Sequence, residues 1–246
     1  MALLARSLGA TYYEGWRIER HAHAWGQLVF TARGVMRVEA EGAVWIVPPA
    51  RAVWIPPEVE HAIIARGEFE LRTVYIAPGQ GAGFPVGCMA SEVPALLREL
   101  ILRIVRLGVL EEGQREHEAL FALLLTGLGE AKSLPTRLVL PRDPRGRRAA
   151  ARLMADPSLP LSLGALAREA GASARTLQRL FLEETGMGFA EWRRRARLIH
   201  SAALLGAAVS VTDAGMAAGY GSPSAFANAF RRMFGRKPME FRARST

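Results

Sequence analysis

The chain has 246 residues, half of them apolar, and a single cysteine, Cys88. This length is comfortable for two domains, and one cysteine excludes both an internal disulfide framework and a cluster of thiolate metal ligands. No segment approaches the roughly 20 uncharged apolar residues of a membrane helix, and the start MALLARSLGA is too short and too interrupted for a signal peptide. We therefore expect a cytoplasmic protein without a membrane partner.

The net charge of +9 is unevenly distributed along the chain. Residues 141–246 hold 18 Arg and Lys against 8 Asp and Glu, a balance of +10, whereas residues 1–140 hold 14 against 15, a balance of −1. A nearly neutral part followed by a basic part indicates that the C-terminal part meets a polyanion while the N-terminal part has a different task.

The first elements that the sequence predicts are short β-strands between Gln27 and Ile76. Val, Ile, Trp and Tyr are frequent in six segments that Gly or Pro separates: QLVFTA, VMRVEA, AVWIV, AVWI, HAIIA and FELRTVYI. Evenly spaced strands of this kind favour an antiparallel sandwich or barrel. In FELRTVYI, the alternation of Phe69, Leu71, Thr73 and Tyr75 predicts a strand that is buried on one face only.

Three of the five histidines lie in this β-rich part, at a spacing that resembles the two short motifs of the cupin barrels. The pattern is His21-x-His23-x3-Gln27-x6-Gly34, then Pro56-x-Glu58-x-x-His61. In metal-binding cupins, the two histidines and a glutamate of the first motif join the histidine of the second around one ion, and residues two apart on a strand share a face. The resemblance implies a divalent ion such as Zn, Ni or Fe, with four candidate ligands: His21, His23, Gln27 and His61.

The chain departs from the cupin motifs at three positions. Gln27 stands where the family has glutamate, and Ala50 and Glu58 replace glycines of the second motif. Because losing the carboxylate lowers metal affinity, two interpretations stay open: the histidines hold an ion, or they line an apolar ligand pocket and satisfy internal hydrogen bonds.

Three tryptophans stand out in the same region: Trp25, Trp45 and Trp54. Each alone is typical of a core. Together with a few polar groups in a small barrel, they predict a pocket for a planar, weakly polar effector.

After the glycine-rich APGQGAGFP, apolar residues recur at helical spacing. SEVPALLRELILRIVRLGVL and EGQREHEALFALLLTGLGEA each predict a helix, and the first has an apolar stripe of Leu96, Leu97, Leu100, Ile101, Ile104 and Val105. These helices either cover the barrel or pair with a second copy. We assign residues 1–83 to the barrel, residues 84–132 to a helical dimerisation segment, and the proline-rich residues 133–144 to an extended linker.

The basic residues 145–246 contain one helix-turn-helix pattern twice. In LSLGALAREAGASARTLQRLFLEETG, Gly171 suits the turn and Ser173 suits the N-cap of the second helix. The buried stripe of that helix is predicted at Leu177, Leu180 and Phe181. The side chains that project elsewhere are Arg175, Thr176, Gln178 and Arg179.

The second copy is VSVTDAGMAAGYGSPSAFANAFRRMFGRKP, in which Ser222 is the expected cap and Pro223 suits the first helical turn. Its buried stripe is predicted at Phe226, Phe230 and Met233, which leaves Ser224, Asn228, Arg231 and Arg232 outward. Between the copies, FAEWRRRARLIHSAALL predicts a long connecting helix whose solvated sides carry arginines 193, 194, 195 and 197.

The C-terminal hundred residues closely resemble the AraC class of bacterial transcription regulators. The matching stretches are LAREAGASARTLQRLFLEETGMGFAEWRRRARL and AAGYGSPSAFANAFRRMFGRKPMEFR. One helix-turn-helix is a weak signal, but two at this separation with the ending FRRMFGRKP are a specific one. The resemblance implies two recognition helices in successive major-groove segments of promoter DNA, about one helical turn apart.

The outward side chains suit this role. Arg175 and Arg179 can donate two hydrogen bonds to guanine and Gln178 can pair with adenine, so the first helix is the better base reader. The second helix is better suited to phosphates. The residues expected to contact DNA are Ser173, Arg175, Thr176, Gln178, Arg179, Ser222, Ser224, Asn228 and Arg231. Gly215 stands where family members commonly have alanine, which costs about 1 kcal/mol unless close packing requires glycine.

We therefore expect a two-domain α+β protein, with an N-terminal cupin-like antiparallel β-barrel and helical segment and a C-terminal all-α double helix-turn-helix. The expected function is transcription regulation, in which a small molecule or metal in the barrel changes the affinity for promoter DNA. We also expect a homodimer, and RNA polymerase as a further partner if the regulator is an activator.

Other interpretations stay open. In the first, the outward arginines do not contact DNA but solvate a helix face or meet another protein. Cupins with three histidines can perform oxygen chemistry on iron, which would make the chain a dioxygenase-like enzyme with an accessory DNA-binding domain, although the expected carboxylate and a paired general base are absent. A further alternative is a cupin that signals through protein contacts beside a domain that binds nucleic acid nonspecifically.

Overall fold

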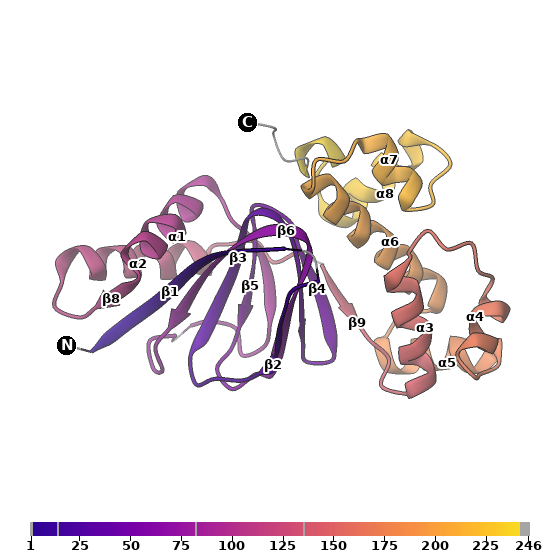
Figure 1. Ribbon diagram of the computed structural model, residues 1–246, viewed down its shortest axis with the longest axis horizontal. Coiled ribbons are helices and arrows are strands. Elements are labelled where there is room, and N and C mark those ends of the chain that lie inside the picture. The colour runs from indigo at the N-terminus through magenta and orange to yellow at the C-terminus, as the bar shows by residue number, and fades with distance from the viewer. Residues whose placement is uncertain (1, 14, 82, 135, 242–246) are drawn as a thin grey trace. The chain divides into compact units, whose positions relative to one another are not determined.

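The computed structural model describes residues 2–13, 15–81, 83–134 and 136–241, which form two compact units. Unit 1 consists of Met1–Glu41 and Trp45–Thr136, and unit 2 consists of Gly42–Val44 and Arg137–Thr246. The first is rich in antiparallel strands and the second is helical (Figure 1). The expected two-domain α+β class is therefore confirmed.

Antiparallel strand pairing builds unit 1. The strands of the described residues are β1 (Leu3–Tyr12), β2 (Arg17–His21), β3 (Gly26–Ala40), β4 (Ala43–Val47), β5 (Arg51–Ile55), β6 (His61–Ile76), β7 (Met89–Glu92), β8 (Val109–Glu111) and β9 (Arg137–Val139). The main path of the sheet is β7-β5-β3-β6-β1-β8. Off this path, β2 pairs with β6 and β4 pairs with β3, while β9, which belongs to unit 2, pairs with β4, whose first two residues also belong to unit 2.

Two pairs of predicted strands are in fact two long strands. QLVFTA and VMRVEA form β3, and HAIIA and FELRTVYI form β6. The register between β3 and β6 shifts on both sides of Arg33, next to Gly34, whose φ is +76°. A Cβ at Gly34 would lie 2.1 Å from the carbonyl oxygen of Glu68, so this bulge requires glycine. A bulge bends a strand without ending it, which is why the predicted breaks were wrong.

Residues 84–132 are not the separate helical segment that we expected. Helices α1 (Ala95–Leu107) and α2 (Arg115–Gly129) are present, but β7 and β8 lie in the same stretch and pair with β5 and β1. The segment is thus part of the sheet unit. Strands β1 and β2, which the sequence patterns missed, complete this unit.

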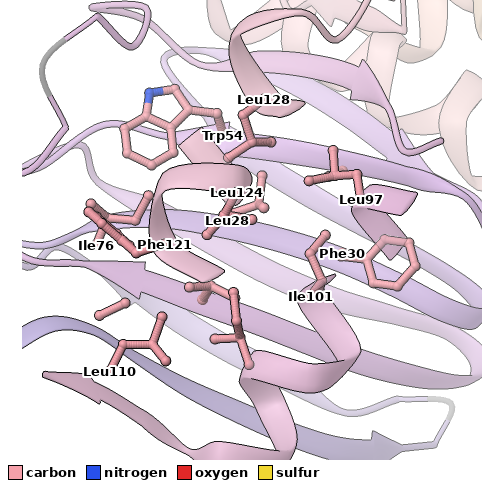
Figure 2. Packing of buried hydrophobic residues seen from close by; sticks show 14 of the residues in the cluster. Leu28, Phe30, Trp54, Ile76, Leu97, Ile101, Leu110, Phe121, Leu124 and Leu128 are labelled. Carbon is pink, nitrogen blue, oxygen red and sulfur yellow. The ribbon is translucent and has the colours of Figure 1, made fainter. Parts of the chain in front are cut away.

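Helices α1 and α2 cover one face of the sheet, as Figure 2 shows. The apolar cluster between the helices and the sheet includes Leu28, Phe30, Trp54, Val74 and Ile76 from strands and Leu97, Ile101, Ile104, Phe121, Leu124 and Leu128 from helices. Because Phe69 and Leu71 are buried on the opposite face of β6, this strand is buried on both faces, and the expectation of one buried face was wrong. Covering the barrel and pairing with a second copy were the two roles considered for these helices, and the structure shows the first.

Unit 2 contains α3 (Pro144–Ala155), α4 (Leu163–Glu169), α5 (Ala174–Thr185), α6 (Phe189–Gly206), α7 (Val211–Ala217), α8 (Pro223–Phe234) and the 3-10 helix η1 (Pro238–Phe241). The sequence patterns missed α3, which Asp143 caps by accepting a hydrogen bond from the Arg145 amide. The expected linker is extended only in part, because residues 137–139 form β9 and residue 144 begins α3. In the described ranges, no helix is long and apolar enough to cross a membrane.

Candidate functional site

The first helix-turn-helix is formed by α4 and α5. Gly171 adopts a φ of +71° in the turn, and the Ser173 hydroxyl accepts a hydrogen bond from the Thr176 amide at 3.1 Å, as expected of an N-cap. The predicted stripe of Leu177, Leu180 and Phe181 is buried. Thr176 is half-buried, and the other predicted reading residues of α5 are exposed: Arg175, Gln178 and Arg179.

Arg179 already has a partner, because its guanidinium donates to the Glu183 carboxylate at 2.7 Å. Both side chains are more than half exposed. An exposed pair at this helical spacing contributes only about 0.3–0.5 kcal/mol, so the guanidinium can exchange this carboxylate for a base at small cost.

The second helix-turn-helix is formed by α7 and α8, with Ser222 as the N-cap of α8. Its hydroxyl accepts from the Ala225 amide at 3.3 Å, and Ser224, Asn228 and Arg231 are exposed as predicted. The buried stripe differs at its end, because Phe234 occupies the core and Met233 is only half-buried. Phe234 packs between Phe230 and Phe241, and this aromatic cluster explains the difference.

The connecting helix α6 runs between the two motifs (Figure 1), and its arginines divide into two groups. Arg194 and Arg195 pair with Glu191 near the surface. Arg193 donates to the carbonyls of Leu159 and Leu161, and Arg197 donates to the carbonyl of Pro157. The expectation that all four solvate the helix was therefore wrong for two of them, which hold the loop between α3 and α4.

In unit 1, the structure brings the three predicted histidines together. One ring nitrogen from each of His21, His23 and His61 lies within 4.8 Å of the others. The Nδ1 atoms bond the backbone carbonyls of Glu19, Trp25 and Val59, at 2.8, 2.7 and 2.9 Å. A carbonyl oxygen only accepts, so each Nδ1 carries the proton and each Nε2 is left with a lone pair.

The side chain of Gln27 adds a fourth acceptor. The Thr73 hydroxyl donates to the Leu28 carbonyl and must therefore accept from the Gln27 amide nitrogen, both at 3.0 Å. This fixes the amide so that its oxygen points at His23, 3.3 Å from Nε2. Two acceptors face each other at that distance, an arrangement that a cation between them or a second proton on His23 would stabilise.

His61 is the most deeply buried member of the group, with no exposed surface. The pKa of His61 is lowered from 6.5 to about 4, mainly by burial; the hydrogen bond to the Val59 carbonyl opposes this shift, and the charges of His21, His23 and Arg20 add to it. Its Nε2 is buried and has no hydrogen-bond partner among the described residues. At neutral pH, His61 thus presents a neutral imidazole with an unshared electron pair, the form in which histidine binds metals.

Two family models match the chain: an AraC-like ligand binding domain over residues 4–128 and a helix-turn-helix domain over residues 166–244. The chain belongs to the AraC family of transcription regulators. The similar NimR, an HTH-type transcriptional regulator of Escherichia coli (strain K12), is 31% identical over 229 residues, which cover 92% of this chain and 82% of NimR.

Other similar proteins cover different shares of this AraC-family chain. GlxA of Rhizobium meliloti is 44% identical over 87 residues, 35% of this chain and 27% of GlxA. A crystal structure of ToxT from Vibrio cholerae with a bound unsaturated fatty acid has a TM-score of 0.40 at 11% identity, over 97% of this chain and 94% of ToxT. The two family models and NimR show that the chain is a DNA-binding regulator with a ligand-binding domain.

The three tryptophans assigned to the effector pocket of this regulator lie in different places. Trp54 belongs to the cluster beneath α1 and α2 (Figure 2). Its ring stacks on Phe84 and its N–H donates to the Pro85 carbonyl. It lies on the opposite face of the sheet from Gln27 and so does not line one site with the histidines, and its contact with an effector stays a prediction. Trp45 is 1% exposed and belongs to the core, whereas Trp25 is half-buried.

Sequence patterns missed the functional surroundings of the histidines in the AraC-family barrel. Arg6 of β1 places its guanidinium 4.8 Å from the Trp25 ring centre and 5.0 Å from the Tyr75 ring centre. Tyr75 in turn packs edge-on against His23. No motif marks Arg6 or Tyr75, and a strand for β1 together with its register to β6 would have been needed to find them.

Proposed function

We propose that His21, His23, His61 and Gln27 hold a divalent metal ion, Zn, Ni or Fe, in the ligand-binding domain, and that this site controls binding to promoter DNA. The observation that carries the proposal is that one ring nitrogen from each of the three histidines lies within 4.8 Å of the others, with the Gln27 amide oxygen 3.3 Å from His23 Nε2. Nδ1 hydrogen bonds to backbone carbonyls are the usual outer contacts that orient metal-binding histidines. The amide of Gln27 is oriented in the same manner by Thr73.

All four ligands would be neutral, so a bound ion would supply its full double charge to the site. Among the described residues, no acidic side chain joins the three histidines as a further ligand. The chain's own groups therefore place and orient the site, but they provide no carboxylate that would serve as a general base. This supports a sensing role, and we propose that the chain is not an enzyme.

Control of DNA binding would operate through a shift of populations. A ligand that binds one arrangement of the ligand-binding domain more tightly than another shifts the equilibrium by that difference in affinity. The exposed Leu96 of α1 and Leu123 of α2, at 69% and 49%, support homodimer formation through the outer side of this helix pair. If the regulator activates transcription, RNA polymerase would be a further partner.

The metal site is tested by the metal content of the purified protein after refolding with Zn or Ni. Wild type and His117→Gln, a control on α2, should bind one equivalent per chain, whereas His61→Gln should bind far less. Visible spectra of the Co(II)-loaded protein would report the histidine ligands. A stoichiometry near zero for the wild type would refute the metal site and leave the barrel as a pocket without an ion.

The DNA-reading role is tested with sequences selected from a random pool, with and without metal. Arg179→Ala should reduce the preference for the selected sequence by about 1–3 kcal/mol, because a base contact is lost. Arg231→Ala should weaken all sequences evenly and reduce the dependence on salt, because a phosphate contact is lost. If both variants weaken binding to all DNA sequences by the same factor, α5 does not read bases.

A further inference from the structure

A row of side chains crosses three strands beside the histidines. Arg6 of β1 is paired in register with Tyr75 of β6, and Tyr75 is paired with Gln27 of β3. Residues paired in this way point to the same face of a sheet. Because strands lie about 4.7–4.9 Å apart, the backbone positions of Arg6 and Gln27 are about 9–10 Å apart, with Tyr75 between them.

The β1 end of this row is open to solvent. Arg6 is exposed, and Leu8, which points to the same face beside Thr73, is 46% exposed. Trp25 and Tyr75 are half-buried. An accessible leucine and two aromatic rings on an inner sheet face offer apolar contact to a ligand.

The polar groups at this end are donors. In the described part of the chain, Arg6 has no carboxylate partner and contacts the rings of Trp25 and Tyr75 instead. The Tyr75 hydroxyl lies beneath the same guanidinium and makes no hydrogen bond to a described residue, so its hydrogen is available to a ligand. A guanidinium and a phenol are thus available for an acceptor of negative charge.

The two ends of the row therefore have opposite chemistry. Gln27 and the histidines present electron pairs, while Arg6 and Tyr75 present hydrogens. A cation is excluded from the Arg6 end by charge, and a neutral ligand would leave the guanidinium without a counter-charge.

We infer that the Arg6–Tyr75 end of this row binds a small aromatic carboxylic acid, the carboxylate on the Arg6 guanidinium and the Tyr75 hydroxyl, the ring against Trp25 and Leu8. Arginine and carboxylate match in a two-bond geometry, and such charged hydrogen bonds are about twice as strong as neutral ones. The inference rests on the proposed role of this domain in sensing and does not require the metal.

The test is calorimetric titration of the full chain with benzoate and with its neutral analogue benzamide. We compare wild type, Arg6→Gln, Tyr75→Phe and the control Arg106→Gln, an exposed arginine of α1, each with the metal removed and with Zn added. Arg6→Gln should weaken benzoate at least about tenfold, the equivalent of 1.4 kcal/mol, and leave benzamide unchanged. Tyr75→Phe should weaken benzoate binding by a smaller factor, and Arg106→Gln should leave benzoate binding unchanged.

Equal benzoate affinity in Arg6→Gln and Arg106→Gln would overturn the inference, as would the absence of benzoate binding to wild type in both metal states. Arg6→Lys should recover part of the affinity, because it keeps the charge and loses the two-bond geometry. Arg6→Gln should still bind one Zn per chain. The metal content therefore tests the proposed function separately from the carboxylate site.

Discussion

Replacing Gly215 by alanine should destabilise the second helix-turn-helix, although alanine is the better helix former. A Cβ at Gly215 of α7 would lie 3.1 Å from both Cγ and Cδ1 of Phe226 in α8, where ordinary contact begins at 3.4 Å. Phe226 has no exposed surface, and its ring lies between those of Tyr220 and Phe230. The ring therefore has little room to move away.

The expected magnitude is a balance of two effects. Alanine in place of glycine gains about 1 kcal/mol of helix propensity, whereas adding a methyl group to a filled core costs about 1–3 kcal/mol. The net change should be a loss of up to about 2 kcal/mol. Gly164 of α4 provides the matched control, because a Cβ there meets only the Ser162 hydroxyl at 3.9 Å. Gly164→Ala should therefore be neutral or stabilising.

Hydrogen exchange of the full chain measures this locally, since amides of α7 and α8 report the opening of their own helix pair. Gly215→Ala should speed exchange there and leave α4 and α5 unchanged. Combining it with Phe226→Leu, which removes the crowded ring atoms, should cost less than the sum of the single changes. Slower exchange of α7 in Gly215→Ala would refute the packing argument and show that propensity decides.

Three further outcomes are expected in the ligand-binding domain. Gly26→Ala should destabilise it by about 3 kcal/mol or more in urea unfolding, because the new Cβ would lie 2.1 Å from the buried Trp54 ring; a loss below 1 kcal/mol would contradict this. Gln27→Glu should tighten Zn binding about tenfold in a competition assay, because a carboxylate is the stronger ligand. It should also destabilise the metal-free fold, since a buried carboxylate replaces the amide that donates to Thr73. Unchanged Zn affinity would exclude Gln27 as a ligand. As the pH falls from 6.5 to 4, the free energy of unfolding of the metal-free protein should decrease by at most about 3 kcal/mol, because the unfolded chain protonates His61 near 6.5 and the folded chain only near 4. His61→Asn should flatten this part of the stability curve. An unchanged slope in that variant would assign the pH dependence to other groups.

The C-terminal unit was predictable because its signals are local. The caps Ser173 and Ser222 and the turn at Gly171 lie within a few residues of the helices that they begin or end. Helix α3 was missed although its Asp143 cap is a local signal, and the other exceptions are contacts between distant segments. Arg193 and Arg197 look like a solvated charge run in the sequence, and only the loop packed against α6 shows which carbonyls they satisfy.

The ligand-binding domain was predictable in its class and its histidines, and much less in its surroundings. The spacing of the three histidines placed them together correctly, although only His21 and His61 lie on strands and His23 lies in the loop after β2. Which sheet face Trp54 occupies depends on α1 and α2, which follow about 40 residues later in the chain. The direction of the Gln27 amide depends on Thr73, across a strand pairing that no short motif encodes.

Arg197 has a consequence for operator architecture. It donates to the Pro157 carbonyl on the loop before α4, and its guanidinium carbon lies 3.0 Å from where a Cβ of Gly219 would be, in the turn before α8. One side chain thus contacts both the loop that leads into the first motif and the turn of the second, and so limits their relative rotation. Inserting a single base pair between the two contacted groove segments turns one of them by about 35° about the duplex axis. The protein should not follow this rotation, so operators of altered phase should retain only the contacts of one motif.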